Sequence, residues 1–156
     1  MIAIYLNDHL AGSTVGLELV RRARGENEGT ELGAFLARLE IEIANDREVL
    51  RRVMRAVGAG EDRLKVAAAW AGEKLGRLKL NGSLFSYSPL SRLVELEGLS
   101  LGVEGKAELW RMLDDLADPR LTDFDFAELT ARAERQRAEL EPYRLIAGHQ
   151  ALEPSD

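Results

Sequence analysis

Residues 30–57 read TELGAFLARLEIEIANDREVLRRVMRAV, and their pattern of apolar side chains decides the fold. Apolar residues recur at spacings of three and four, which is typical of one face of an α-helix. Asp46 interrupts the repeat near its middle, and Thr30 stands where a helix N-cap is expected. The stretch predicts a long amphipathic helix over 31–57 with a charged residue on its buried face. The apolar positions of that face are Leu32, Leu36, Leu39, Ile43, Leu50, Val53 and Val57.

Similar repeats lie on both sides of this stretch and predict four further helices. We expect them over 2–24, 61–77, 89–116 and 124–147, the last capped by Asp123. The linker 25–29 is short and polar, so the first two helices form an antiparallel hairpin. Asp118-Pro119 separates the last two helices in the same way. The connection 58–88 is long enough to return the chain along the bundle.

These elements predict an all-α fold. We expect a four-helix bundle in which two antiparallel hairpins are joined by a long crossover that contains a short extra helix. A five-helix up-and-down bundle is the alternative. We expect one domain over 1–148 and a frayed tail over 149–156. A chain of 156 residues can bury a core without staples, and this one has no cysteine.

The composition of the chain argues against nucleic acid and membranes as partners. The net charge of −6 argues against nucleic-acid binding, although the part of the chain around 61–92 is locally basic. No apolar stretch approaches the ~20 residues that cross a bilayer, so we expect no membrane partner. The N-terminus lacks a basic region followed by an apolar run, which predicts a cytoplasmic protein. The excess of arginine over lysine, with many alanines, suggests a bacterial source.

A polar residue interrupts the apolar face near the middle of each long predicted helix. These residues are Ser13, Asp46, Glu104 and Gln136. We expect them to share one layer halfway along the bundle, where helical proteins place metal sites, ligand pockets and polar networks that fix register. Two interpretations stay open. In the first, the layer is a structural network in which Asp46 pairs with Arg137.

The second interpretation is a metal site. Asp46, Glu104, Glu108 and His9 are its candidate ligands, and iron or manganese is the candidate cofactor. The helix order and the position of the layer resemble those of ferritin-like di-iron proteins. That group carries Glu-x-x-His on two of its four helices. Here the only histidines are His9 and His149, and neither stands three residues after a glutamate.

The chain also resembles an uncharacterised family of bacterial helical-bundle proteins. The resemblance is carried by LNDHLAG at residues 6–12 and PLSRLVELE at residues 89–97. It implies a helical bundle like that of the ferritin-like group, without the Glu-x-x-His ligands, and it implies no function.

A second candidate site lies near the start of the helix predicted over 89–116. Ser88-Pro89 reads as an N-cap followed by the first helical residue. Basic and hydroxyl side chains beside a helix N-terminus favour anions, including phosphate or a nucleotide. The candidate residues are Arg77, Lys79, Ser88 and Arg92. The competing interpretation is a solvated basic face, and no Gly-rich phosphate motif is present.

The helix predicted over 89–116 has two apolar stripes, so its buried face is ambiguous. One stripe follows Leu90 and Val94, with Glu97, Glu104 and Glu108 on the same face. The other consists of Leu96, Leu99, Val103 and Trp110 and could contact a second copy in a homodimer. Glycines at 98, 102 and 105 suggest a close helix approach. With no complete catalytic motif, the leading hypothesis is a non-enzymatic bundle that acts through a protein partner or as an oligomer.

Overall fold

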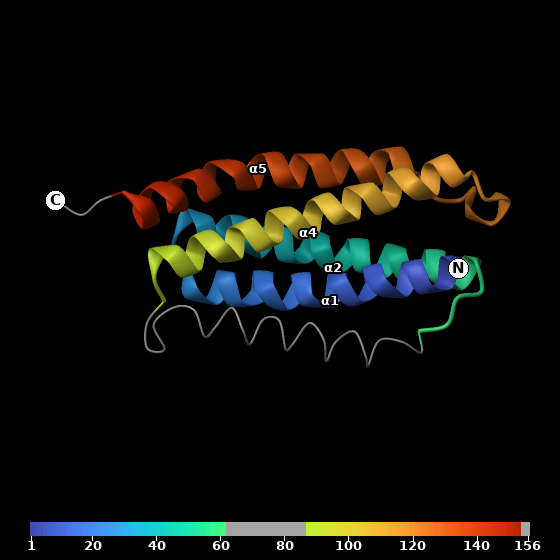
Figure 1. Ribbon diagram of the computed structural model, residues 1–156, viewed down its shortest axis with the longest axis horizontal. Coiled ribbons are helices and arrows are strands. Elements are labelled where there is room, and N and C mark those ends of the chain that lie inside the picture. Colours follow the sequence, from blue (N-terminus) through green and yellow to red (C-terminus); the bar gives the residue numbers. More distant parts are fainter. Residues whose placement is uncertain (62–86, 154–156) are drawn as a thin grey trace.

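Four long helices make up most of the chain that the structure describes. The computed structural model describes residues 1–61 and 87–153 (Figure 1). The helices are α1 (Ile2–Glu26), α2 (Glu31–Ala56), α4 (Pro89–Leu116) and α5 (Phe126–Leu152), with a 3-10 turn, η1 (Pro119–Leu121), before α5. These residues form no strand, and the prediction of an all-α four-helix bundle is confirmed. From residue 62 on, the helix predicted over 61–77 lies outside the described residues. The five-helix alternative depends on that helix and is therefore not tested.

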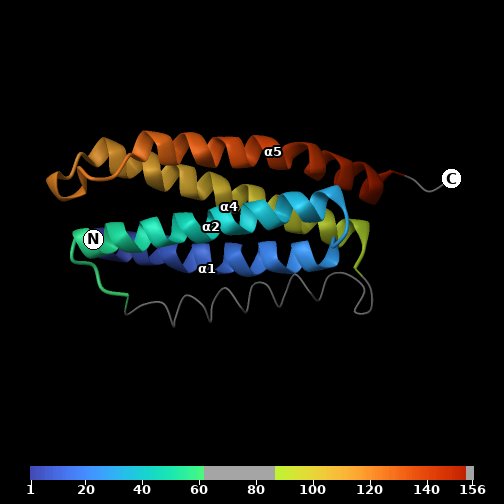
Figure 2. The same ribbon diagram turned by 180° about the vertical axis from the view of Figure 1, so that it is seen from behind.

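The helices form two antiparallel pairs. Figure 1 shows α1 running against α2 and α4 running against α5, and Figure 2 shows the same pairs from behind. The end of α2 and the start of α4 lie at opposite ends of the bundle, so α2 and α4 run in the same direction. Helix α4 packs along both α5 and α1, whereas α2 and α5 approach each other at few positions. The order of directions is the one that the two-hairpin prediction requires.

The hydrophobic core is divided into two main clusters, one toward each end of the bundle. All four helices contribute to each cluster, and Leu36, Leu96 and Leu140 of the first are fully buried. The second is built around Trp110, with Leu6, Leu10, Leu50, Val53, Leu109, Leu113, Leu121, Phe126 and Leu129. Asp46 and Gln136 lie between the clusters along their helices, and each is only 3% exposed. The middle of the bundle is therefore polar.

Side-chain caps set two of the helix starts where the sequence predicts them. The Thr30 hydroxyl accepts a hydrogen bond from the backbone N–H of Gly33 at 3.0 Å. The Ser88 hydroxyl accepts one from Ser91 at 3.1 Å, with Pro89 at the first helical position. The prediction for the last helix is wrong, because Asp125 and not Asp123 caps α5.

The C-terminal end of α5 also differs from the prediction. A frayed tail was expected from residue 149, but α5 continues to Leu152. Two contacts explain the extra turn. Ala147 is fully buried and Ala151 packs against the first core cluster. Gln150 accepts a hydrogen bond from Arg92 of α4 at 3.0 Å.

The structure also settles which face of α4 is buried. The stripe of Leu96, Leu99, Val103 and Trp110 is at most 3% exposed, whereas Leu101 on the carboxylate face is 74% exposed. The buried stripe contributes to both main clusters and, through Val103, to a small third cluster, and helices of the same chain complete all three. It therefore does not provide the homodimer surface that its sequence suggested.

Candidate ligand pocket and its polar layer

Five side chains form a hydrogen-bonded layer at mid-bundle. Asp46 of α2 accepts from Lys106 of α4 on one carboxylate oxygen and from Arg132 of α5 on the other. Gln136 of α5 accepts from Lys106 and donates to Glu42 of α2 at 2.7 Å. We call this group the polar layer. It joins three helices and balances two carboxylates with two cations.

The ion pairs of this layer are costly to break because they are buried. The Lys106 side chain is 15% exposed and Asp46 only 3%. Removal of water lowers the pKa of Lys106, and the neighbouring Asp46 carboxylate acts in the opposite direction. Separating such a pair leaves an uncompensated charge in the interior. The arrangement is a structural network of the type expected, but Asp46 pairs with Lys106 and Arg132 and not with Arg137.

The sequence placed two of the four expected residues correctly. Asp46 and Gln136 meet in the layer, but Ser13 donates to the backbone carbonyl of Leu10 in its own helix at 2.6 Å. Lys106 was missed, although a signal for it exists. It stands three residues after Val103 and four before Trp110, on the stripe that proved to be buried.

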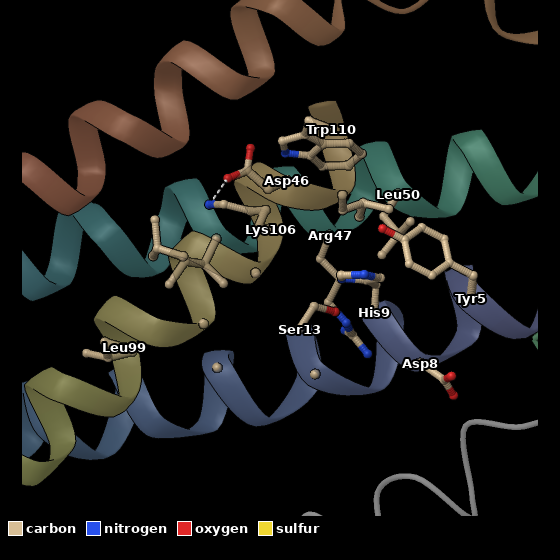
Figure 3. A pocket seen from close by; sticks show the side chains of 17 residues that line it. Tyr5, Asp8, His9, Ser13, Asp46, Arg47, Leu50, Leu99, Lys106 and Trp110 are labelled. Atoms are coloured by element: carbon tan, nitrogen blue, oxygen red, sulfur yellow. Dashed lines mark hydrogen bonds and ion pairs between the residues drawn. The ribbon is translucent and has the colours of Figure 1, made fainter. Parts of the chain in front are cut away.

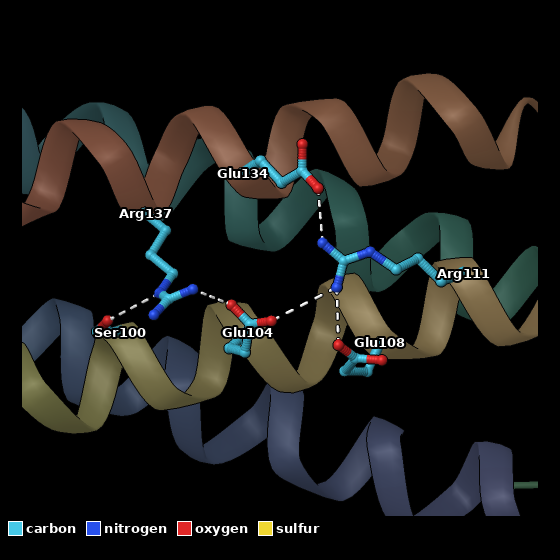
Figure 4. Close-up of polar contacts among 6 residues, drawn as sticks. All are labelled: Ser100, Glu104, Glu108, Arg111, Glu134 and Arg137. Carbon is cyan, nitrogen blue, oxygen red and sulfur yellow. Dashed lines mark hydrogen bonds and ion pairs between the residues drawn. The ribbon is translucent and has the colours of Figure 1, made fainter.

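Glu104 lies on the other side of α4, at the surface shared with α5 (Figure 4). It pairs with Arg137 of α5 and, at 3.4 Å, with Arg111. Arg111 also pairs with Glu108 at 2.8 Å and with Glu134 of α5 at 2.6 Å. The expected pairing of Asp46 with Arg137 is therefore wrong, because Arg137 faces this surface network.

The four candidate metal ligands are not brought together. Asp46 is engaged by cations in the polar layer, Glu104 and Glu108 belong to the α4–α5 surface, and His9 lies on α1. Among residues 1–61 and 87–153, no cluster of three His, Asp or Glu side chains could hold a metal ion. Lys106 and Arg132 occupy the sides of the Asp46 carboxylate that a metal would use.

A pocket of about 480 Å³ opens between α1, α2 and α4, with Asp46 and Lys106 of the polar layer in its wall (Figure 3). Its large apolar lining residues come from both main core clusters and from a small third one that contains Val103. They are Ile43, Leu50, Leu99, Val103, Leu109 and Trp110. Its polar lining includes Tyr5, His9, Ser13, Asp46, Arg47 and Lys106. The pocket is therefore mostly apolar, with a few polar groups that converge on it.

Glycines keep the outer part of this pocket open. Gly12 and Gly16 of α1 and Gly102 and Gly105 of α4 line it, and a Cβ added at any of them would meet no described atom within 4 Å. Gly98 of α4 does lie close to α1, since its added Cβ would meet Leu19 at 3.0 Å. The helix predicted over 61–77, which the glycines of α4 were expected to approach, lies from residue 62 on outside the described residues.

Burial affects two polar groups of the pocket lining, the His9 ring and the Trp110 indole N–H. The His9 ring packs edge-on against Tyr5 with the ring centroids 4.6 Å apart. Burial lowers the pKa of His9, and the nearby Asp8 acts in the opposite direction. Trp110 is 1% exposed, and its indole N–H has no hydrogen-bond partner among the described residues. The pocket thus offers His9 beside apolar walls, and the Trp110 N–H is buried in one of those walls.

The candidate anion site at the start of α4 is only partly described. Arg77 and Lys79 lie outside the described residues. Ser88 already caps the helix, and the Arg92 guanidinium lies 5.6 Å from the Tyr87 ring centroid. Tyr87 donates to the buried Glu95 at 3.0 Å, and burial raises the pKa of that carboxyl group. A buried carboxylate one turn away weakens the case for an anion here.

Comparison with protein-family models, with curated proteins and with solved structures gave no match. In the part of the chain that the structure describes, no helix is long and apolar enough to cross a membrane.

Proposed function

We propose that this protein is a non-enzymatic binding protein whose pocket between α1, α2 and α4 takes one small, mostly apolar molecule. The pocket itself carries the proposal. Its volume of about 480 Å³ lies within the range of roughly 300–1,000 Å³ of small-molecule sites. Such sites combine apolar walls with a few convergent polar groups, and this one does so at the middle of the bundle.

The arrangement of polar groups supports binding more than catalysis. Ser13 is hydrogen-bonded to the Leu10 carbonyl, and no hydrogen bond joins it to His9 in the described part of the chain. A serine nucleophile needs such a base within reach. Lys106 is held by Asp46 and Gln136, which supports a fixed wall and not a reactive amine.

The glycines of the pocket add independent support. A glycine inside a helix costs about 1 kcal/mol relative to alanine. Packing among the described residues does not account for Gly12, Gly16, Gly102 or Gly105, because a Cβ at any of them would meet no described atom within 4 Å. Space for a ligand gives these residues a common role.

Three finer points belong to the same proposal. The order of helix directions supports kinship with the ferritin-like group, since two antiparallel pairs follow each other with α2 and α4 parallel. The charge and arginine-rich composition support a bacterial, cytoplasmic setting. Action through a protein partner or as a homodimer remains compatible with a bundle that responds to a ligand. Size-exclusion chromatography with light scattering tests the homodimer directly.

The pocket can be tested by filling it. N-phenylnaphthylamine, a neutral dye that fluoresces in apolar surroundings, serves as the probe. We expect one dye to bind per chain, and we expect Gly102→Leu and Gly12→Leu to abolish binding, because each leucine extends into the pocket. Gly25→Leu is the matched control, since Gly25 is exposed on α1 and its added Cβ also meets nothing.

The outcome depends on the comparison between these variants. Circular dichroism melts verify that all three variants fold. The proposal fails if the wild-type protein binds no dye, or if the folded Gly102→Leu and Gly12→Leu proteins bind it as well as Gly25→Leu does.

A further inference from the structure

One cation in the pocket lining, Arg47, lies outside the ion pairs of the polar layer, and its charge points to the class of ligand. The polar layer is neutral within itself, because Asp46 and Glu42 face Lys106 and Arg132. That wall therefore attracts neither a cation nor an anion by net charge. Arg47, one residue after Asp46, is the remaining cation of the lining and is not part of the layer.

Arg47 has no carboxylate partner within 4 Å among the described residues. Its guanidinium donates to the Thr14 hydroxyl of α1 at 3.0 Å, and its Nε is buried without a partner there. The acidic side chains that influence it are engaged elsewhere, because Glu48 and Glu61 both pair with Arg51. Figure 3 shows the Arg47 side chain extending from α2 toward Ser13 and His9 of α1.

This placement is costly without an anion. A buried or half-buried guanidinium retains its charge, and it is favourable only when its donors are satisfied. Burial is the main cause that lowers the pKa of Arg47. Asp8, the one carboxylate of the lining outside the polar layer, is exposed, and it makes no ion pair with Arg47 in the described residues.

We propose that the ligand is an apolar monocarboxylate, such as a medium-chain fatty acid, whose carboxylate binds Arg47 beside His9 while its apolar part lies against Leu50, Leu99 and Trp110. The inference rests on the proposed function. One unpaired cation matches one negative charge, and a phosphate dianion would bring a second charge into a mostly apolar site. His9 supplies a ring N–H as a further donor, and the apolar walls accept an alkyl chain without polar groups.

The test compares two probes that differ only in their head group. Decanoate and decanol carry the same alkyl chain, and displacement of N-phenylnaphthylamine or calorimetry measures the affinity of each. We expect decanoate to bind the wild-type protein about ten-fold more tightly, as one charge-assisted hydrogen-bonded pair allows. Arg47→Met should remove this preference by weakening decanoate binding to about the affinity that the same variant has for decanol. Arg55→Met is the matched control, because Arg55 is exposed on the same helix and lies outside the pocket.

The two proposals fail in different ways. If both probes bind the wild-type protein equally and Gly102→Leu excludes both, the carboxylate inference is overturned and the pocket stands. If neither probe nor the dye binds, the proposed function itself is overturned. If folded Arg47→Met loses decanol and decanoate alike, Arg47 shapes the pocket and does not select a carboxylate. Arg47→Lys, which keeps the charge, should retain part of the preference.

Discussion

Lys106 and Glu104 stand two residues apart on α4, yet their side chains lie on opposite sides of that helix. Lys106 faces the interior between α1, α2 and α4, where its side chain is 15% exposed and bonded to Asp46. Glu104 faces the surface between α4 and α5, where its 36% exposed side chain pairs with Arg137. Both are ion pairs between helices, and they differ in strength because only the second is exposed to water. The interior pair is expensive to break, whereas the surface pair is screened.

The largest effect is expected from Lys106→Met. It removes one of the two cations from Asp46, and Arg132 alone remains to compensate the buried carboxylate. Breaking a buried pair costs about 3–5 kcal/mol, and we expect the lower end because Arg132 stays. Urea unfolding followed by circular dichroism measures the loss.

A second variant distinguishes charge from packing in this experiment. Lys106→Met combined with Asp46→Leu removes both charges, so we expect it to recover most of the stability. If the double variant is less stable than Lys106→Met alone, the loss of the Asp46 contacts to Arg132 and Gln136 outweighs the relief of the buried charge.

Two glycine substitutions compare an open position in the pocket, Gly102 of α4, with a closely packed position at the start of α2, Gly33. We expect Gly102→Ala to stabilise the protein by about 1 kcal/mol, because its methyl group enters open space and alanine favours the helix. Gly33→Ala is the opposite case, since its Cβ would lie 2.2 Å from the Asn27 carbonyl oxygen, and we expect a loss. Thermal melts of both variants measure the difference. A gain at Gly33 equal to that at Gly102 would contradict the close contact between Gly33 and Asn27.

His9 should make the pocket side sensitive to acid. Because burial lowers its pKa, the folded protein binds a proton there less readily than the unfolded chain does. Below the ordinary histidine pKa of about 6.5 the unfolded chain takes up the proton first. This contribution to stability is therefore complete above that pH and decreases as the pH falls through the window below it.

The measurement is the difference in urea midpoint between wild type and His9→Phe at pH 7 and pH 5. Phenylalanine keeps an aromatic ring against Tyr5, so we expect the variant to lose less stability on acidification. Subtracting the variant removes the opposite contribution of Glu95, whose pKa burial raises. His149, exposed at the end of α5, gives the control variant His149→Phe. An unchanged acid dependence in His9→Phe would show that His9 does not titrate differently in the folded state.

The sequence predicts the architecture well because helix periodicity and caps act locally. Thr30 and Ser88 cap α2 and α4 as expected, and α4 has the predicted bounds. The site is harder to predict because the helix spacing of Glu104 and Glu108 is compatible with either face of α4. Only packing against α1 and α5 decides which stripe is buried. Once that stripe is known, the spacing from Val103 to Trp110 places Lys106 on it and so toward the interior.

The smallest effect is expected at the α4–α5 surface. A double-mutant cycle on Glu104→Ala and Arg137→Ala should give a coupling free energy below about 1 kcal/mol, because both side chains are well exposed. Sodium chloride should reduce it further, since the Debye length is only about 3 Å at 1 M salt. The same cycle on Asp46 and Lys106 should give a larger coupling that responds less to salt. Because Arg111 also contacts Glu104 and Glu134, the surface cycle is best repeated in an Arg111→Ala background. A surface coupling that remains large there and withstands salt would mean that the α4–α5 face is shielded from water, and the contrast between the two sides of α4 would no longer hold.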